Sequence, residues 1–547
     1  TAVAGARGVA SALDAAPELP SLVARCCDGH TLARLGRCSF RLRAEVATEE
    51  AFAERAAKLC PAGSSAWLRR DLAVLPGWGS GSGWQYAARH FAAKLGLRNR
   101  LAICGADGRL RVCEPVEGGG ASADVVKVPP QCLPFSLCWG PQGEYLAFTA
   151  QRSPLAPAGL VLAPPPSSGL APLVVPLRSG LLPYYLCPSP CGTRLALLGV
   201  LQDRQVLLVA DVTQVSAPCR ERAPPVTLHA LGGAAPLYMD WAPHGPELLL
   251  ALRGRELKRV RADVSLECEG ADAAAVNQRA VEPASEERGG SFEGGGNSPG
   301  ETRLSGVVSF RAPQWLPWPG SREGRWLVPK DGQGGRVSLA LVDPATGDAE
   351  IVCEHLPPPP KTVHFAAARS GRWAAWCGIH DERGHGGVFV RRLPPSHGPP
   401  LMVFNGPAEA LAWGGDRLAL LLRAPEVHGA LVWAVWDPPV VGAGTAVAAA
   451  GRLAVAPQVF RPHGSFVERI LPFFDQFERR LRVWSPANDA LVFTDASATV
   501  WVQPFPIAGA SRGQHPLSGL VGAAEHTRLA PPAFRVAEGT FACWSPL

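Results

Sequence analysis

Short apolar runs separated by turn residues dominate the chain from about residue 84 to its end. Residues 101–113 (LAICGADGRLRVC) are representative, because apolar and polar positions alternate on either side of the turn sequence Ala106-Asp107-Gly108. Such alternation places the apolar side chains on one face of a strand, and an Asp-Gly pair between two runs favours a β-hairpin. This part of the chain is therefore predicted to be all-β.

One sequence element recurs in this region: an apolar strand ends in Trp or a substitute, Pro follows two residues later, and a turn leads into a second apolar strand. The clearest copies cover residues 137–148 (LCWGPQGEYLAF), 239–250 (MDWAPHGPELLL) and 483–493 (VWSPANDALVF). Weaker copies cover residues 186–198, 314–328, 364–376 and 410–422. The Trp-equivalent positions are 139, 188, 241, 315, 367, 413 and 484, and four of the six intervals between them measure 46 to 53 residues.

A repeat of this length, with several short strands in each unit, predicts the blades of a β-propeller, because a small twisted sheet cannot bury its faces without neighbours. Residues 539–547 (GTFACWSPL) form a further motif copy with no strands after it. We therefore expect residues 541–544 to close the ring by pairing with strands near residues 101–113. The seven internal copies and this composite predict eight four-stranded blades, or seven if one weak copy is spurious.

The domain organisation follows from changes in composition along the chain. Residues 39–59 are rich in Ala, Glu and Arg and predict one or two helices, and the glycine run at residues 77–83 predicts a flexible linker, since it matches no phosphate-binding spacing. We expect a small helical N-terminal appendage and linker over residues 1–83 and the propeller over residues 84–547. Residues 268–300 are predicted to form a disordered insertion. Because the chain begins at Thr1, a removed leader or organelle targeting stays open.

Composition and charge narrow the function classes. The 59 Gly and 54 Pro residues disfavour a helical protein, and the net charge of +6 is dispersed, so nucleic-acid binding is not expected. The longest uncharged stretch, residues 155–177, carries six prolines, which excludes a continuous membrane helix and with it membrane insertion. The 15 cysteines are too dilute for a disulfide scaffold and odd in number, which favours the cytoplasm or another reducing compartment.

The elements WGPQG, WAPHG and WSPAND, each followed by an apolar strand, resemble the W-S-P-D-G repeat of TolB-like, WD40-like (PD40-type) β-propellers, which also occurs in the propeller of dipeptidyl-peptidase-type enzymes. The usual Asp of that repeat is replaced here by Gln142, His244 or Ala487. The resemblance implies a module for protein interaction or ligand docking, and some family members gate an attached hydrolase domain. This chain has no Gly-x-Ser-x-Gly nucleophile elbow, so a peptidase activity is not expected.

The densest group of potential metal ligands lies in the segment IHDERGHGG at residues 379–387, which contains His380, Asp381, Glu382 and His385. The two histidines are five residues apart and match no defined zinc spacing. A solvated hairpin loop is the favoured interpretation, and a metal site for lyase chemistry is the alternative.

The richest aromatic segment covers residues 466–484 (FVERILPFFDQFERRLRVW), in which charged residues stand between the apolar ones. It could present Phe473, Phe474 and Phe477 to a partner, with Arg479, Arg480 and Arg482 at the rim of the contact, or it could pack between blades. Packing is the favoured interpretation for the aromatic side chains.

The function expected from these features is that of a monomeric, non-catalytic β-propeller, which acts as a scaffold for protein partners and needs no cofactor. The alternative is a metal-dependent lyase or hydrolase with its site at the central channel. Metal analysis of the protein distinguishes the two.

Overall fold

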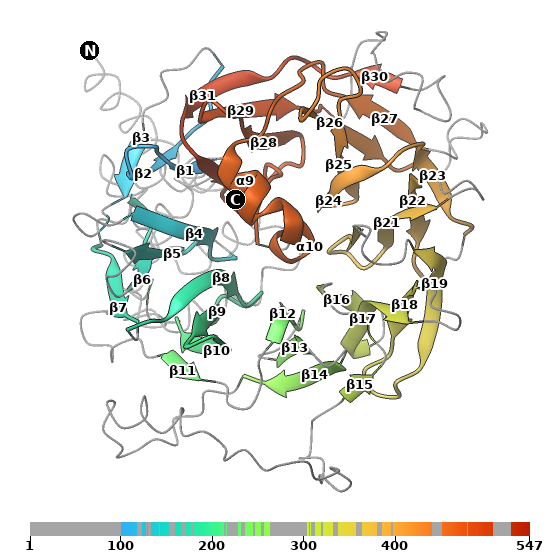
Figure 1. Ribbon diagram of the computed structural model, residues 1–547, viewed down its shortest axis with the longest axis horizontal. Coiled ribbons are helices and arrows are strands. Elements are labelled where there is room, and N and C mark those ends of the chain that lie inside the picture. Colours follow the sequence, from blue (N-terminus) through green and yellow to red (C-terminus); the bar gives the residue numbers. More distant parts are fainter. Residues whose placement is uncertain are drawn as a thin grey trace, which may run out of the picture.

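The computed structural model describes residues 100–546 apart from a number of loops, the longest of which cover residues 216–227, 263–302, 440–450 and 507–526. Its strands form eight sheets arranged in a ring around a central axis (Figure 1). We number these sheets as blades 1 to 8 in their order along the chain. The fold is therefore an eight-bladed β-propeller, which confirms the predicted class and the higher of the two predicted blade counts.

Blades 1 to 4 each contain four strands, which lie side by side in order from the axis to the rim. From the innermost strand outward, blade 1 is formed by β32 (Phe541–Trp544), β1 (Leu101–Cys104), β2 (Leu110–Cys113) and β3 (Ala123–Val126), and blade 2 by β4 (Leu133–Trp139), β5 (Leu146–Gln151), β6 (Gly159–Ala163) and β7 (Leu173–Pro176). Blade 3 is formed by β8 (Leu182–Pro188), β9 (Arg194–Leu201), β10 (Arg204–Asp211) and β11 (Leu228–Ala230), and blade 4 by β12 (Pro236–Trp241), β13 (Glu247–Leu252), β14 (Glu256–Arg261) and β15 (Arg303–Ser305).

Blades 5 to 8 follow the same plan, with variations in the last two. Blade 5 is formed by β16 (Gln314–Trp318), β17 (Ser321–Asp331), β18 (Val337–Val342) and β19 (Ala349–Leu356), and blade 6 by β20 (Phe365–Ala367), β21 (Trp373–Ile379), β22 (Gly386–Arg392) and β23 (Leu401–Phe404). Blade 7 is formed by β24 (Ala408–Gly414), β25 (Arg417–Arg423), β26 (Leu431–Asp437) and β27 (Arg452–Val455), with β30 (Thr527–Leu529) as a fifth strand. Blade 8 is formed by β28 (Ala490–Thr494), β29 (Thr499–Pro504) and β31 (Phe534–Glu538).

Blade 1 closes the ring with strands from both ends of the propeller. β32 pairs antiparallel with β1, with Trp544 opposite Leu101 and Phe541 opposite Cys104. The predicted closure is thereby confirmed, and it places the C-terminal strand innermost in its blade. Because the last strand completes the first sheet, the inner edge of β1 is paired and the two ends of the ring are joined in one blade.

The core is divided among the interfaces between neighbouring blades. One cluster joins Ala102 and Leu110 of blade 1 to Leu137 and Phe148 of blade 2, and others join blades 2 and 3, 4 and 5, 5 and 6, and 8 and 1. A strand inside a blade is therefore covered on both faces, and six of the seven positions of β25 are buried. Burial on both faces explains why these strands are continuous apolar runs where an exposed sheet would alternate.

Three of the motif tryptophans join their blade to the preceding one. Their indole Nε1 atoms donate hydrogen bonds to backbone carbonyls: Trp241 to Cys187 (3.0 Å), Trp413 to Ala366 (3.0 Å) and Trp484 to Ala412 (3.1 Å). In every pair the acceptor directly precedes the motif position of the preceding blade. A buried indole N–H is stabilised by such an acceptor, so in these three copies the motif also supplies a contact between blades.

Two motif copies add a link in the opposite direction around the ring. The Asp240 side chain accepts a hydrogen bond from the backbone N–H of Trp315 in the next blade (2.7 Å). The Gln314 side chain accepts one from the backbone N–H of Ala367 (2.7 Å). Both polar side chains are buried immediately before their motif position and satisfy an amide that neighbouring strands leave unpaired.

Blades 7 and 8 depart from the four-stranded pattern. Trp484 forms an isolated bridge with Leu491 of β28 and so supplies the innermost position of blade 8. β30 lies between β29 and β31 in the chain but pairs parallel with β27 of blade 7. Arg417 further joins the two blades by donating to the carbonyl of Phe505 (2.6 Å) while it pairs with Asp437. The chain therefore links these blades at both their inner and outer sides.

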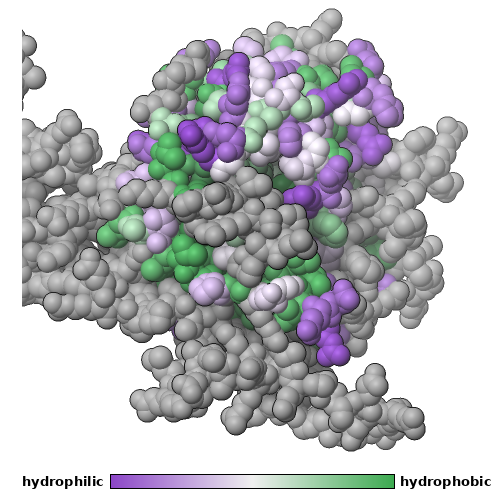
Figure 2. All heavy atoms as spheres, turned by 60° about the vertical axis from the view of Figure 1, so that its left-hand side comes forward, coloured by the Kyte–Doolittle hydropathy of each residue, from purple (hydrophilic) through white to green (hydrophobic). Residues whose placement is uncertain are grey.

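The rim carries single exposed apolar side chains. Figure 2 turns the side of the ring that holds blades 1 to 3 toward the viewer and shows apolar side chains among hydrophilic ones there. Val125 of β3 and Val174 of β7 are 56% and 53% exposed. Outermost strands have no blade to cover one of their faces, so such exposure is expected at these positions.

The predicted appendage and linker at residues 1–83, its helices at 39–59 and the insertion at 268–300 lie outside the described residues. No helix in the described part of the chain is long and apolar enough to cross a membrane.

Candidate functional site in the central channel

Residues 464–482, which we call the channel segment, occupy the centre of the ring (Figure 1). The segment contains α9 (Gly464–Arg469), the 3₁₀ turn η5 (Leu471–Phe473) and α10 (Phe474–Phe477). His463 caps α9 by accepting a hydrogen bond from the backbone N–H of Ser465 (3.2 Å). Pro472 at the start of η5 lacks a backbone donor, which limits the segment to short helical turns.

Polar side chains of α10 bind the backbone of strands that face the channel. Gln476 accepts from the backbone N–H and donates to the carbonyl of Met239 in β12, both at 3.0 Å. Tyr185 of β8 donates its hydroxyl to the Gln476 carbonyl (2.9 Å), and Asp475 accepts from the backbone N–H of Ala312 (2.8 Å). The segment thus completes the hydrogen bonding of blades 3, 4 and 5.

Arg480 crosses from the channel segment to blades 2 and 3. Its Nη1 donates to the carbonyls of Ser136 and Leu186, both at 3.3 Å. Its guanidinium carbon lies 4.7 Å from the Tyr185 ring centroid and 4.4 Å from that of Phe477. Burial lowers the pKa of Arg480, and carbonyl and aromatic contacts stabilise the charge in this place.

The residues of the predicted partner surface are not equivalent in the structure. Phe474, Phe477 and Arg480 are buried in the channel, and Phe477 packs edge-on against Tyr185 with ring centroids 5.5 Å apart. Phe473 is 44% exposed, and Arg479 lies outside the described residues. The role of these residues in binding stays a prediction, and Phe473 is the one described member that faces outward.

The predicted metal ligands His380, Asp381, Glu382 and His385 lie outside the described residues, in the connection between β21 and β22. Within the described ranges, no group of three or more His, Cys, Asp or Glu side chains is placed to hold a metal ion. The metal site therefore also stays a prediction.

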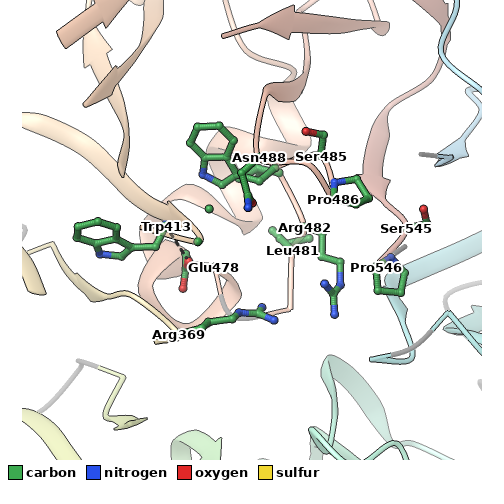
Figure 3. Close-up of a pocket in the computed structure, with 14 residues that line it drawn as sticks. Arg369, Trp413, Glu478, Leu481, Arg482, Ser485, Pro486, Asn488, Ser545 and Pro546 are labelled. Atoms are coloured by element: carbon green, nitrogen blue, oxygen red, sulfur yellow. Dashed lines mark hydrogen bonds between the residues drawn. The ribbon is translucent and has the colours of Figure 1, made fainter. Parts of the chain in front are cut away.

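A pocket of about 120 Å³ lies where the motif turns of four blades meet the end of the channel segment (Figure 3). Blades 6, 7, 8 and 1 contribute residues on or next to their motif positions, and the channel segment contributes the rest. The lining includes Arg369, Trp413, Gly414, Trp484, Asn488, Ser545 and Pro546 from the blades and Glu478, Leu481 and Arg482 from the channel segment.

Tight packing around the two tryptophans shapes this pocket. A side chain at Gly414 would place its Cβ 2.5 Å from the Trp484 ring, so this motif copy needs Gly directly after its Trp. Glu478 accepts a hydrogen bond from the backbone N–H of Trp413 (3.2 Å). Both indoles are also held by their Nε1 bonds to the preceding blade. The apolar walls are therefore rigid parts of the ring.

Arg482 contributes a positive charge to the lining of the pocket. Its Nη2 donates to the carbonyl of Pro141 (3.4 Å), and no carboxylate of the described residues lies within ion-pair distance of its guanidinium. Burial, together with the positive charge of Arg369, lowers the pKa of Arg482 to about 9, and Glu144 opposes this effect. Arg482 is still protonated at neutral pH, so the pocket holds two neighbouring cations.

The sequence contained only part of this site. Arg482 was visible as a charged position in the aromatic segment, but Arg369, Asn488 and Ser545 stand in three separate motif copies. A polar or charged residue close after the motif position, as in Ala367-Ala368-Arg369, is the only local signal, and turns contain such residues for other reasons.

The solved structures that are similar to this chain share little sequence identity with it. No family model and no curated protein matches the chain. TolB from Acinetobacter baumannii is similar in structure, with 11% sequence identity and a TM-score of 0.27 over 55% of this chain and 65% of that chain. The dihydro-heme d1 dehydrogenase NirN has 11% identity and a TM-score of 0.42 over 82% of this chain and 75% of that chain.

The β-propeller domain of the Trilobed protease from Pyrococcus furiosus is also similar, with 10% identity and a TM-score of 0.35 over 69% of this chain and 92% of that chain. The resemblance to TolB-like propellers that the tryptophan motif predicted is confirmed as one of fold, which the order of strands in the eight sheets establishes.

Proposed function

We propose that this protein is a non-catalytic propeller that docks protein partners at the ends of its ring. The observation that carries the proposal is the channel segment, which occupies the position where an enzyme of the alternative class would bind its substrate. Its polar side chains are engaged by the ring: Asp475, Gln476 and Glu478 each accept a hydrogen bond from a backbone N–H of an innermost strand or the residue leading into one.

The remaining reactive groups near the axis also favour binding over catalysis. Burial raises the pKa of Cys138 and Cys187, both on innermost strands, to about 12. These thiols are protonated at neutral pH and are therefore poor nucleophiles. A general acid or base must reach its substrate within hydrogen-bonding distance, and the carboxylate of Asp475 is buried against Ala312.

The outward surface of the channel segment is the docking surface that we propose. Val467 on α9 and Phe473 on η5 are 43% and 44% exposed, and the neighbouring Phe466 and Leu471 pack against the core. Aromatic residues such as Phe are enriched in protein interfaces, and Phe473 is an exposed aromatic residue on a packed support. Of the predicted aromatic contact, the proposed docking surface keeps Phe473, and it adds Val467.

Phe473 and Phe474 form a matched pair for the test. A photo-crosslinking amino acid at position 473, introduced into the protein in its native source, is expected to capture a defined partner. F473S is expected to lose that complex with an unchanged melting temperature, because its side chain is exposed. F474A is expected to lower stability by about 3 kcal/mol through loss of a buried ring. Equal capture at position 125 on the rim, or full retention of the complex by F473S, would refute the docking surface.

A further inference from the structure

We propose that the pocket between blades 6, 7, 8 and 1 binds a carboxylate. The proposal goes beyond the docking surface of the channel segment, because the two lie at opposite ends of β28. His463, which begins α9, donates its backbone N–H to Thr494 at the end of that strand (3.1 Å), whereas Asn488 in the pocket stands just before Ala490 at its start. Binding in one place is therefore separable from binding in the other.

The charge of the lining residues selects a monoanion. Arg369 and Arg482 contribute two positive charges and Glu478 contributes one negative charge, which leaves a net charge of +1. Figure 3 shows the side chains of Arg369 and Arg482 extending into the same part of the pocket. A carboxylate carries one negative charge and fits the planar donor face of a guanidinium, whereas phosphate carries a charge of about −1.5 to −2 at neutral pH.

Arg482 is the main binding group. Among the described residues its side chain makes one hydrogen bond, from Nη2 to the carbonyl of Pro141, so its other guanidinium N–H groups are available to a ligand. A bound carboxylate would offset the repulsion between Arg482 and Arg369, which in the free protein contributes to the low pKa of Arg482. The gain is large in a partly enclosed site, since charge-assisted hydrogen bonds strengthen as water is excluded.

Asn488 provides a neutral donor at the same place. Its backbone adopts a left-handed conformation (φ 57°) that Asn tolerates better than most residues, and its N–H donates to the Ser485 carbonyl (2.9 Å) to close the motif turn. Its carbonyl is engaged by Arg417 (2.5 Å). Within the described part of the chain, the side-chain amide has no hydrogen-bond partner, and it lies in the pocket lining.

The size of the pocket suits a small ligand head. Its volume of about 120 Å³ is enough for several water molecules, because a cavity needs about 10–15 Å³ on the same measure to hold one. The Trp413 and Trp484 walls leave room for a carboxylate and the methylene groups that carry it. The source is either a free organic acid or the side chain or C-terminus of an acidic peptide.

Calorimetric titration of the full chain at pH 7 and constant ionic strength tests the proposal, with acetate, inorganic phosphate and an acetylated, amidated Gly-Glu-Gly peptide as probes. Acetate or the peptide is expected to bind more tightly than phosphate. Acetate binding without peptide binding identifies a free acid as the source, and tighter peptide binding identifies a protein partner. R482Q is expected to weaken binding at least tenfold, since a charge-assisted hydrogen bond is lost.

Two further variants distinguish loss of the binding site from misfolding and from a general loss of positive charge. N488G retains the left-handed turn and removes the amide, so it is expected to weaken binding several-fold even if R482Q fails to fold. R535Q removes an exposed arginine of β31 that pairs with Glu538 and is expected to change nothing. Binding by N488G at the wild-type affinity, an equal loss in R535Q, or a preference for phosphate would overturn the carboxylate site. None of these results depends on Phe473.

Discussion

Buried thiols show how single residues respond to their surroundings in this protein. Burial raises the pKa of Cys104, Cys138, Cys187 and Cys377 to about 12, against an ordinary value of 9.0. In the unfolded chain these thiols ionise as the pH passes 9, whereas in the folded protein they keep their protons. The stability that they contribute is therefore complete below pH 9 and is lost as the pH rises toward 12.

Alkaline denaturation measures this effect. The free energy of unfolding is expected to fall between pH 9 and pH 11 by up to about 1.4 kcal/mol per pH unit for each thiol, because the unfolded state binds fewer protons. Urea unfolding at pH 8, 9.5 and 10.5 provides the measurement, and the variant C138A/C377A should show a smaller slope than the wild type. Identical slopes in the two proteins would show that burial does not raise these pKa values.

At the scale of elements, the channel segment is held by its polar side chains as much as by its aromatic ones. Q476A removes both hydrogen bonds to the buried backbone of Met239 and leaves a donor and an acceptor without partners. We expect a loss of about 1–3 kcal/mol in the free energy of unfolding, measured by urea titration. E468A, on the exposed side of α9, serves as the control and should change stability by less than about 0.5 kcal/mol. Equal effects of the two substitutions would mean that the segment does not support the ring.

The sequence predicted the elements that repeat and missed those that do not. Trp139, Trp241 and Trp484 sit in motif copies, and each copy contains its own strand and turn signals, so the blades could be placed from local pattern. The position of Gln476 depends on Met239, which is 237 residues away, and that of Arg480 on Leu186, 294 residues away. No local pattern separates a polar side chain that caps a distant strand from one that faces water.

The same reasoning explains why the pocket could not be predicted. Its two arginines belong to a motif turn and to the channel segment, and they meet only because eight blades bring the ends of their inner strands around one axis. Gly follows the motif Trp at position 414 as it does at position 140, but the ring of Trp484 that requires Gly414 comes from the following blade. The local pattern around position 414 therefore does not show which neighbour the residue contacts.

At the scale of the whole molecule, the closure of blade 1 joins the first and last strands of the propeller, so the stability of each depends on the other. β32 supplies the innermost strand. Just before it, the backbone N–H of Thr540 donates to the carbonyl of Cys104, and just after it, the backbone N–H of Ser545 donates to the carbonyl of Arg100, both at 2.8 Å. Trp544 donates its backbone N–H to the carbonyl of Arg482 (2.9 Å), so the closing strand also holds the end of the channel segment. A variant that stops after Thr540 therefore loses the inner edge of blade 1 and one wall of the carboxylate pocket.

This truncation is expected to lower the melting temperature by more than any single substitution proposed above, because it exposes the cluster between blades 8 and 1 that contains Leu101, Val492 and Trp544. Hydrogen exchange should increase first in β1 and β28, the strands on either side of the missing one, while β16 to β19 on the far side of the ring stay protected at moderate temperature. If exchange instead rises equally in all blades, the ring unfolds as a single cooperative unit, and closure contributes to every blade equally. If β1 and β28 keep their protection, β32 does not hold the ring closed, and the blade interfaces alone support the fold.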